Sequence, residues 1–373
     1  MTDDASSAMR RASDLVRAGN PIAATEMIQA ALRGTAASAM SRPGPVPETL
    51  RAAEDVAPFG KGRGLRKTLA ELAARARPGG GVGGAPAPEP VLPRGARFDH
   101  GSFTCPAGER AYRLYIPDLR ARRPAGLVMM LHGCTQSPAD FANGTGMNRI
   151  ADAHDLIVVY PGQSRGANMQ SCWNWFAPSD QERGSGEPAI LAGLAVQIRQ
   201  DHDIPEDRIF VAGLSAGGAM AVILGRAYPD VFTHVGVHSG LPYKAARDVQ
   251  SAFAAMGGSL RQTSGAPLRP LPTIVFHGAA DATVNAANGQ RIVDEAGAAG
   301  AELRDSGTMG GRRYIRDTVL APNGQPILEH WRIDGLGHAW SGGDATGSYA
   351  DPAGPDASAE MVRFFLDATG TVL

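Results

Sequence analysis

The sequence predicts an α/β protein with a doubly wound, mostly parallel sheet covered by helices on both faces. Beyond residue 97, short runs rich in β-branched residues alternate with helical stretches, as expected of repeated strand–helix units. Several of these runs are almost wholly apolar, which is typical of parallel strands that are buried on both faces. We therefore expect one α/β domain over residues 98–373.

The elements follow in a regular order along this domain. The expected strands are 112–116, 127–131, 156–160, 209–212, 235–238, 273–276 and 328–333. The expected helices are 139–154, 188–201, 216–228, 286–299 and 357–368. Five of these seven strands are thus followed by an expected helix, which favours parallel pairing.

The first 97 residues have a different composition. Residues 1–77 are rich in Ala and Arg, and 8–18 and 22–32 carry apolar residues at helical spacing around a Gly-Asn-Pro break, which predicts a helical hairpin. Residues 65–76 predict a further helix. Residues 78–97 combine flexible Gly with extended Pro, which is typical of a linker. The predicted organisation is a helical extension over 1–77, a linker over 78–97 and a catalytic domain over 98–373.

Composition excludes several classes of function. The 36 Lys and Arg residues balance 37 Asp and Glu residues, whereas a nucleic-acid-binding protein normally has a basic excess. No apolar run reaches the roughly 18 residues of a membrane span. The first residues include two acids and lack the apolar core of a secretory leader, so we expect a cytoplasmic protein.

Cysteines and glycine-rich segments indicate neither a metal nor a cofactor. Cys105, Cys134 and Cys172 are too few for a disulfide framework and match no metal-ligand spacing, so reduced thiols are the simplest expectation, with a pair between Cys134 and Cys172 left open. No Gly-rich segment has the P-loop or dinucleotide pattern.

The segment 208–220, RIFVAGLSAGGAM, carries a nucleophile motif. An apolar strand runs through G-x-S-x-G at 213–217 into a helix of small residues, which is the nucleophile elbow of α/β-hydrolases. Small flanking residues let the strand and the helix pack closely enough to expose the hydroxyl of Ser215. We expect Ser215 to be the nucleophile.

The general base and its acid partner follow downstream in the order that α/β-hydrolases use. Asp281 follows the strand 273–276 through a short turn, and His338 lies in the Gly-rich loop 335–343 after the last strand. We expect Asp281 to orient His338, and His338 to take the proton of Ser215. The other acids considered, which we expect to be solvated, are Asp294, Asp305, Asp317 and Asp334. The histidines in or beside strands, which we expect to be structural, are His234, His238, His277 and His330.

An oxyanion hole requires two backbone N–H groups beside the nucleophile. We expect one from Ala216 and the other from Cys134, because Gly133 lets the backbone turn inward after the strand 127–131. Thr135 is the alternative donor.

Aromatic residues cluster on the loops expected around the site. Trp173 lies in the segment 171–176 and Trp340 follows His338 by two residues, so both rings could line a substrate pocket. Asn174 could donate a hydrogen bond to the substrate. The alternatives are that the rings only cover the edge of the sheet and that Asn174 only holds its loop.

Five motifs in order resemble the polyhydroxybutyrate (PHB) depolymerase family of esterases. They are LHGCTQ at 131–136, SCWNWF at 171–176, GLSAGGAM at 213–220, HGAADATV at 277–284 and GLGHAWSGG at 335–343. The resemblance covers about residues 98–373. It implies an α/β-hydrolase fold with Ser215 as nucleophile, Asp281 as acid, His338 as base and Cys134 as oxyanion amide.

The expected function is that of a serine esterase that works through an acyl-enzyme. Its expected substrate is a polyhydroxyalkanoate or its oligomers, and the alternative is a short-chain or feruloyl-type carboxylesterase. A non-catalytic granule-associated protein is the rival from another class. Residues 1–77 are open to three interpretations: a homo-oligomerisation element, a handle on polymer granules, or a loosely attached tail.

Overall fold

A computed structural model of the chain describes residues 87–120, 122–259 and 271–367. The strands are β1 (Arg97–Cys105), β2 (Gly108–Ile116), β3 (Gly126–Leu131), β4 (Leu156–Pro161), β5 (Ile209–Leu214), β6 (His234–His238), β7 (Thr273–Gly278), β8 (Ala301–Met309), β9 (Arg312–Leu320), β10 (Pro326–Ile333), β11 (Trp340–Ser341) and β12 (Ala350–Asp351). The helices are α4 (Pro138–Thr145), α5 (Met147–Ala153), α6 (Gly186–Asp201), α7 (Ala216–Ala227), α8 (Val249–Met256), α9 (Ala287–Ala296) and α10 (Ala357–Asp367), with a 3-10 turn η1 (Pro178–Asp180).

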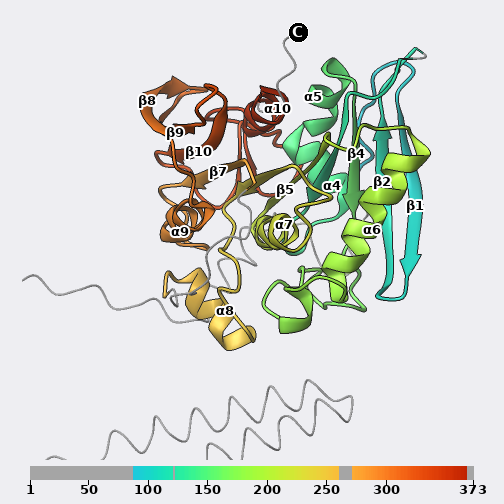
Figure 1. Cartoon of the computed structure of the whole chain (residues 1–373), viewed down its shortest axis with the longest axis horizontal. Helices are drawn as coiled ribbons and strands as arrows, with labels where there is room; N and C mark the ends of the chain where they lie inside the picture. The colour runs from blue at the N-terminus through green and yellow to red at the C-terminus, as the bar shows by residue number, and fades with distance from the viewer. Residues whose placement is uncertain (1–86, 121, 260–270, 368–373) are drawn as a thin grey trace, which may run out of the picture. The chain divides into compact units, whose positions relative to one another are not determined.

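One ten-stranded sheet organises the described residues. Its strand order is β1-β2-β4-β3-β5-β6-β7-β10-β9-β8 (Figure 1). The strands from β4 to β10 in this order pair in parallel, whereas the strands added at each end pair antiparallel. The parallel centre confirms the predicted doubly wound sheet, and it brings the carboxyl ends of β3, β5, β6, β7 and β10 to one edge.

Helices cover both faces of the sheet because the central strands are apolar on both sides. In β3, Leu127, Met129 and Leu131 join a core with α6, α7 and α9, while Val128 and Met130 join a second core with α4, α5 and α10. All five side chains are fully buried, and each contributes roughly 1.5–3 kcal/mol of hydrophobic stabilisation. In Figure 1, α6 and α7 lie in the lower part of the view and α5 and α10 in the upper part.

The predicted elements of the domain are present, with one break. The helix expected over 139–154 is two helices, because Gly146 adopts a left-handed backbone (φ 60°) and its N–H caps α4 by donating to Ala142 O. The short helix α8 was not expected. A capping box stabilises its start, since the Asp248 carboxylate accepts from the N–H of Ser251 at 2.7 Å.

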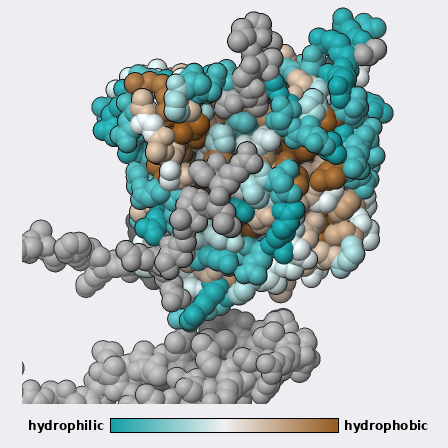
Figure 2. Space-filling model, in the orientation of Figure 1, coloured by the Kyte–Doolittle hydropathy of each residue, from teal (hydrophilic) through white to brown (hydrophobic). Residues whose placement is uncertain are grey.

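The edge strands β1, β8 and β9 were also not expected. Most side chains of β8 are exposed, so the strand lacks the apolar alternation that would identify it. Figure 2 shows hydrophobic surface at the β8–β9 end of the sheet among hydrophilic areas, and Leu303, Met309 and Ile315 are exposed there. Charged neighbours such as Arg304, paired with Asp317, protect such an edge from pairing with another chain.

The end of the predicted linker packs against the catalytic domain. The Glu89 carboxylate pairs with Arg113 on β2 at 2.5 Å, and Pro88 O accepts from Asn143 on α4 at 2.8 Å. Residues 87–96 are therefore attached to the domain rather than a free spacer. The helices expected within 1–77 lie outside the described residues.

Candidate active site

Ser215 lies at the turn between β5 and α7, where the motif predicts it. Its backbone is in a left-handed conformation with φ 58° and ψ −118°, which is strained for a residue with a side chain. Gly213 and Gly217 make the turn possible, since a Cβ on Gly213 would collide with the backbone of Gly217 and one on Gly217 with that of Leu131. The serine side chain is held partly exposed at the carboxyl edge of the sheet.

Asp281 and His338 meet at the same edge. Asp281 follows β7 and His338 follows β10, and His338 Nδ1 donates to Asp281 Oδ2 at 2.8 Å. The backbone N–H groups of Thr283 and Val284 donate to the other carboxylate oxygen at 2.9 Å. Burial opposes ionisation of this fully buried side chain, but the hydrogen bond and charge of His338 and the Val284 N–H outweigh it, and the pKa of Asp281 is lowered to about 2.

His238 ties the serine turn to the histidine loop. Its backbone oxygen accepts from Ser215 N–H at 2.9 Å, and its Nε2 accepts from Ser341 N–H at 3.1 Å, three residues beyond His338. Burial lowers the pKa of His238 to about 3, and the neighbouring His277 and His338 add to the shift. The ring therefore stays neutral and can keep this acceptor role.

Within the described residues no hydrogen bond joins Ser215 Oγ to His338, and such contacts often tighten only when substrate binds.

His277 supports the loop that carries Asp281. Its Nε2–H donates to Val284 O at 2.9 Å and lies 3.6 Å from Asp281 Oδ2. Burial lowers its pKa, so the ring is neutral and its Nδ1 carries no proton. The expectation that His234, His238, His277 and His330 are structural agrees with their burial, each being at most 4% exposed.

The alternative acids lie away from His338. Asp294 is exposed on α9, where it accepts from Gln290, and Asp305, Asp317 and Asp334 pair with arginines of β8 and β9.

Two backbone N–H groups beside Ser215 have no acceptor within the described residues, those of Ala216 and Cys134. Ala216 opens α7, where the helix dipole favours negative charge. Gly133 lies against the serine, since a Cβ built on it would be 3.6 Å from Ser215 Cβ. The Thr135 N–H already donates to Gln170 O at 2.7 Å. The structure thus favours Cys134 over Thr135 as the second donor.

Cys134 and Cys172 form a disulfide. The expectation of reduced thiols is therefore wrong for two of the three cysteines, and Cys105 is free. The bond joins the loop after β3 to the loop after β4. The expected oxyanion donor is the N–H of Cys134 itself, so the disulfide restrains the position of that donor.

The structure contradicts substrate contact by the two tryptophan rings. Trp173 is fully buried and its Nε1–H donates to His132 O at 3.0 Å. Trp340 is 1% exposed, stacks on His238 and donates to Ser358 Oγ at 3.1 Å. Both rings are buried and their N–H groups are bonded inside the protein, so they do not line the site.

Asn174 is engaged in holding its own loop. Its Nδ2 donates to Glu187 Oε1 and its Oδ1 accepts from Asn168, both at 2.8 Å, while its backbone N–H donates to Glu187 Oε2. The buried Glu187 at the start of α6 is thus the anchor of segment 171–176, although its sequence surroundings are those of a polar loop. These bonds support the loop-holding alternative for Asn174.

Gln136 is a positioning residue that was not predicted, although it lies in the motif 131–136. Its Oε1 accepts from Gly133 N–H at 2.9 Å, and its Nε2 donates to Ser348 O at 2.9 Å and to Asp140 at 3.1 Å. Asp140 also accepts from the Ser348 N–H at 2.9 Å. The loop after β3 is thereby tied to the segment that follows His338.

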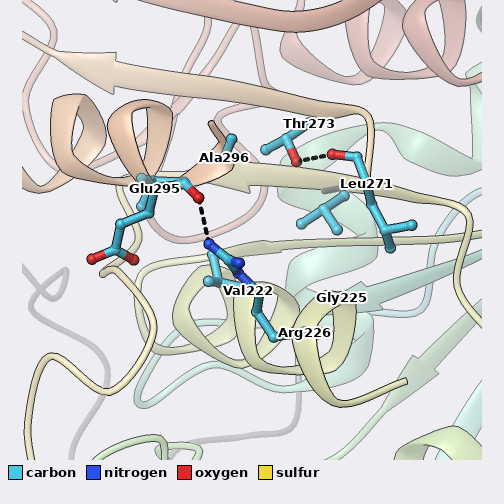
Figure 3. Close-up of a pocket in the computed structure, with 9 residues that line it drawn as sticks. Val222, Gly225, Arg226, Leu271, Thr273, Glu295 and Ala296 are labelled. Atoms are coloured by element: carbon cyan, nitrogen blue, oxygen red, sulfur yellow. Dashed lines mark hydrogen bonds between the residues drawn. The ribbon is translucent and has the colours of Figure 1, made fainter. Parts of the chain in front are cut away.

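The pocket drawn in Figure 3 is a different feature. Val222, Gly225 and Arg226 of α7 line it together with the start of β7, and Arg226 donates to Glu295 O at 2.5 Å. These residues lie near the C-terminal end of α7, whereas Ser215 precedes its N-terminal end. The pocket is therefore at the opposite edge of the sheet from the candidate site.

Comparison with known proteins agrees with this arrangement. Over 239 residues the chain is 34% identical to a poly(3-hydroxyalkanoate) depolymerase C of Paucimonas lemoignei, a match that covers 60% of this chain and 57% of that protein. It is 29% identical to a feruloyl esterase B of Neurospora crassa over 39% of this chain and 49% of that protein. The matches thus span about half the length of these relatives.

The fold has a counterpart of known structure. An acetyl xylan esterase from Aspergillus awamori aligns with a TM-score of 0.52 at 18% identity, over 64% of this chain and 94% of that one. With the parallel sheet and the elbow, this likeness shows the α/β-hydrolase fold. The model of the family described as esterase PHB depolymerase matches residues 110–298, just over half of the chain, which include Ser215 and Asp281. This chain therefore belongs to the esterase PHB depolymerase family.

Proposed function

We propose that this chain is a serine esterase that hydrolyses carboxylic esters through an acyl-enzyme. The observation that carries the proposal is the 2.8 Å hydrogen bond between His338 and Asp281, at the edge of the sheet where Ser215 is partly exposed. Because Asp281 stays ionised, it accepts the Nδ1–H of His338 and favours the tautomer of the neutral ring whose free nitrogen is Nε2. A neutral imidazole in this tautomer is the base that a serine nucleophile requires.

The mechanism follows from these positions. Ser215 Oγ attacks the ester carbonyl as His338 Nε2 takes its proton, and the N–H groups of Ala216 and Cys134 stabilise the negative oxygen. His338 then donates that proton to the leaving alcohol. Water, deprotonated by His338, then attacks the acyl-enzyme; His338 returns this proton to Ser215 Oγ as the acyl–Oγ bond breaks, which releases the acid and the free serine.

The substrate class proposed is a polyhydroxyalkanoate, in particular its oligomers. Family membership and the relative named as a poly(3-hydroxyalkanoate) depolymerase support it. A short-chain or feruloyl-type carboxylesterase is the second candidate, because another relative is named as a feruloyl esterase.

Initial rates of the wild type and of Ser215→Ala test the proposal and choose between the candidates. Substrates are p-nitrophenyl esters of increasing acyl length, methyl ferulate and 3-hydroxybutyrate oligomers. We expect Ser215→Ala to lower turnover about 10⁶-fold, while Ser102→Ala, on the exposed edge strand β1, keeps full activity. Retained activity of Ser215→Ala would refute the mechanism. A preference for oligomers supports a depolymerase, and a preference for simple or aromatic esters supports a carboxylesterase.

The cellular location and the partners of the chain are the remaining questions. Among the described helices none has the length and apolarity to cross a membrane. The cytoplasmic location stays a prediction; the Cys134–Cys172 disulfide favours an oxidising compartment instead, because such bonds persist mainly there. Binding of granules or of a second copy through residues 1–77 stays a prediction.

A further inference from the structure

Tyr349 is an aromatic residue that lies beside His338 and has no part in the mechanism proposed for Ser215, His338 and Asp281. Its ring meets the ring of His338 edge to face, with centroids 6.3 Å apart and planes at 79°. We propose that Tyr349 contacts the substrate and forms the wall of the site on the side of the leaving alcohol. This inference rests on the esterase function proposed above.

Hydrogen bonds of the neighbouring residue connect Tyr349 to the oxyanion loop, residues 133–136. The preceding residue, Ser348, is held by Gln136 and Asp140. Gln136 in turn accepts from the N–H of Gly133, which lies against Ser215. Asp281 is bound at Nδ1 of His338. Tyr349 is therefore connected both to the base and to the loop that is expected to hold the oxyanion.

The backbone of Tyr349 is fixed in an unusual conformation. Its φ is 50°, a left-handed value that is uncommon and strained for a bulky residue. The Trp340 N–H holds it by donating to Tyr349 O at 2.7 Å, next to the pairing of β11 with β12. Strained residues that their surroundings hold in place cluster at ligand sites.

The side chain is also available to a ligand. Part of the Tyr349 ring packs on the core that contains Trp340, and the rest is exposed; within the described residues its hydroxyl has no hydrogen-bond partner. By contrast, the two tryptophans expected to line the site use both their rings and their N–H groups inside the protein. Tyr349 is thus in a position to offer the aromatic surface that those residues do not.

The chemistry of the leaving group explains what Tyr349 would select. His338 must donate a proton to the alcohol oxygen from within about 3 Å. The group attached to that oxygen then passes beside the ring that packs against His338. An aromatic or bulky alcohol portion can pack on Tyr349, and such ring contacts change a rate constant by about three- to tenfold.

The test compares benzyl butyrate with n-propyl butyrate, which share the acyl group, on the full chain. We expect Tyr349→Ala to lower kcat/KM for the benzyl ester about three- to tenfold and for the propyl ester much less. Tyr349→Phe should retain the wild-type ratio. Tyr314→Ala is the matched control, because that partly buried ring packs against Trp331, and it should leave the ratio unchanged.

The ratio of the two rates is independent of how much of a preparation is folded. An unchanged ratio would overturn the proposal, whether both esters lose activity equally, which would show a structural role only, or neither loses any. Ser215→Ala on the same esters separates this result from the proposed function. An active Ser215→Ala refutes the esterase mechanism, whereas with an inactive one the ratio measured for Tyr349→Ala alone decides the role of Tyr349.

Discussion

The carboxylate of Asp281 determines the state of the base. It is fully buried, yet it accepts the His338 Nδ1–H and two backbone N–H groups. With a pKa of about 2, Asp281 is ionised at any pH above about 4. In the proposed mechanism this carboxylate holds the Nδ1–H of His338, and Nε2 is the nitrogen that acts as base towards Ser215.

Replacing Asp281 by Asn should remove that orientation with little change in volume. The amide can donate to Nδ1 and favour the wrong tautomer, so we expect kcat to fall about 10⁴-fold with a smaller change in KM. Asp294→Asn is the control, because Asp294 is an exposed acid that follows the same strand. Similar kcat values for both variants in a p-nitrophenyl butyrate assay would contradict the role of Asp281.

Residues that sequence can identify are those whose chemistry has a local signature. Ser215 has its elbow, and the order of acid and base along the chain restricts Asp281 and His338. Gln136 and Tyr349 have no such signature, since Gln136 bonds to Ser348, 212 residues away, and Tyr349 meets His338 from a different part of the loop region. Trp173 and Trp340 suggest a substrate pocket in sequence because they stand next to site residues, but their rings point into the core.

The oxyanion loop, residues 133–136, is held from two sides at the scale of whole elements. On one side the Cys134–Cys172 disulfide and the Thr135–Gln170 hydrogen bond attach it to the loop after β4. On the other side Gln136 attaches it to Ser348, in the segment after His338. The loop should therefore be preorganised before substrate arrives, which is the condition for strong oxyanion stabilisation.

Removing the disulfide should loosen the oxyanion loop. In a Cys134→Ala/Cys172→Ala double variant we expect kcat to fall tenfold or more, short of the roughly 10²–10³-fold cost of losing an oxyanion donor. KM should change less, because the donors act mainly in the transition state. The free energy of unfolding should drop by about 4 kcal/mol, from the entropy of a closed loop whose ends are 38 residues apart.

Cys105→Ala is the matched control, since Cys105 is the free cysteine of β1. Its kcat and urea midpoint should equal those of the wild type. If the double variant also kept the wild-type kcat, the disulfide would have no part in positioning the oxyanion donor.

Elements buried on both faces could be predicted from sequence, and edge elements could not. The central strands are apolar without interruption, as β3 and β5 show. The hairpin β8–β9 is largely exposed and charged, so its pairing depends on the neighbouring strand β10 rather than on its own pattern.

At the scale of the whole molecule, the two cores enclose neutral histidines. Burial lowers the pKa of His234 and His238 to about 3, and that of His330 to about 4. In the unfolded chain each takes up a proton below about pH 6.5. Between these values the unfolded state binds more protons, so the free energy of unfolding must fall as the pH falls.

The pH dependence of unfolding measures this effect. Between pH 6.5 and 5 we expect a loss of up to about 2 kcal/mol for each buried histidine, followed in urea titrations at fixed temperature. His234→Phe, in contact with Phe210 and Phe365, should reduce the slope by one proton. A slope identical to that of the wild type would contradict the neutral state of His234 in the folded protein.

The most direct test of the central claim is to trap the nucleophile. A fluorophosphonate, which phosphonylates activated serines, is added to the wild type, Ser215→Ala and Ser102→Ala, and the adducts are located by peptide mass spectrometry. Our account predicts one adduct per chain, on Ser215, in the wild type and Ser102→Ala, and none in Ser215→Ala. An adduct on another residue, or labelling of Ser215→Ala at the wild-type rate, would contradict it.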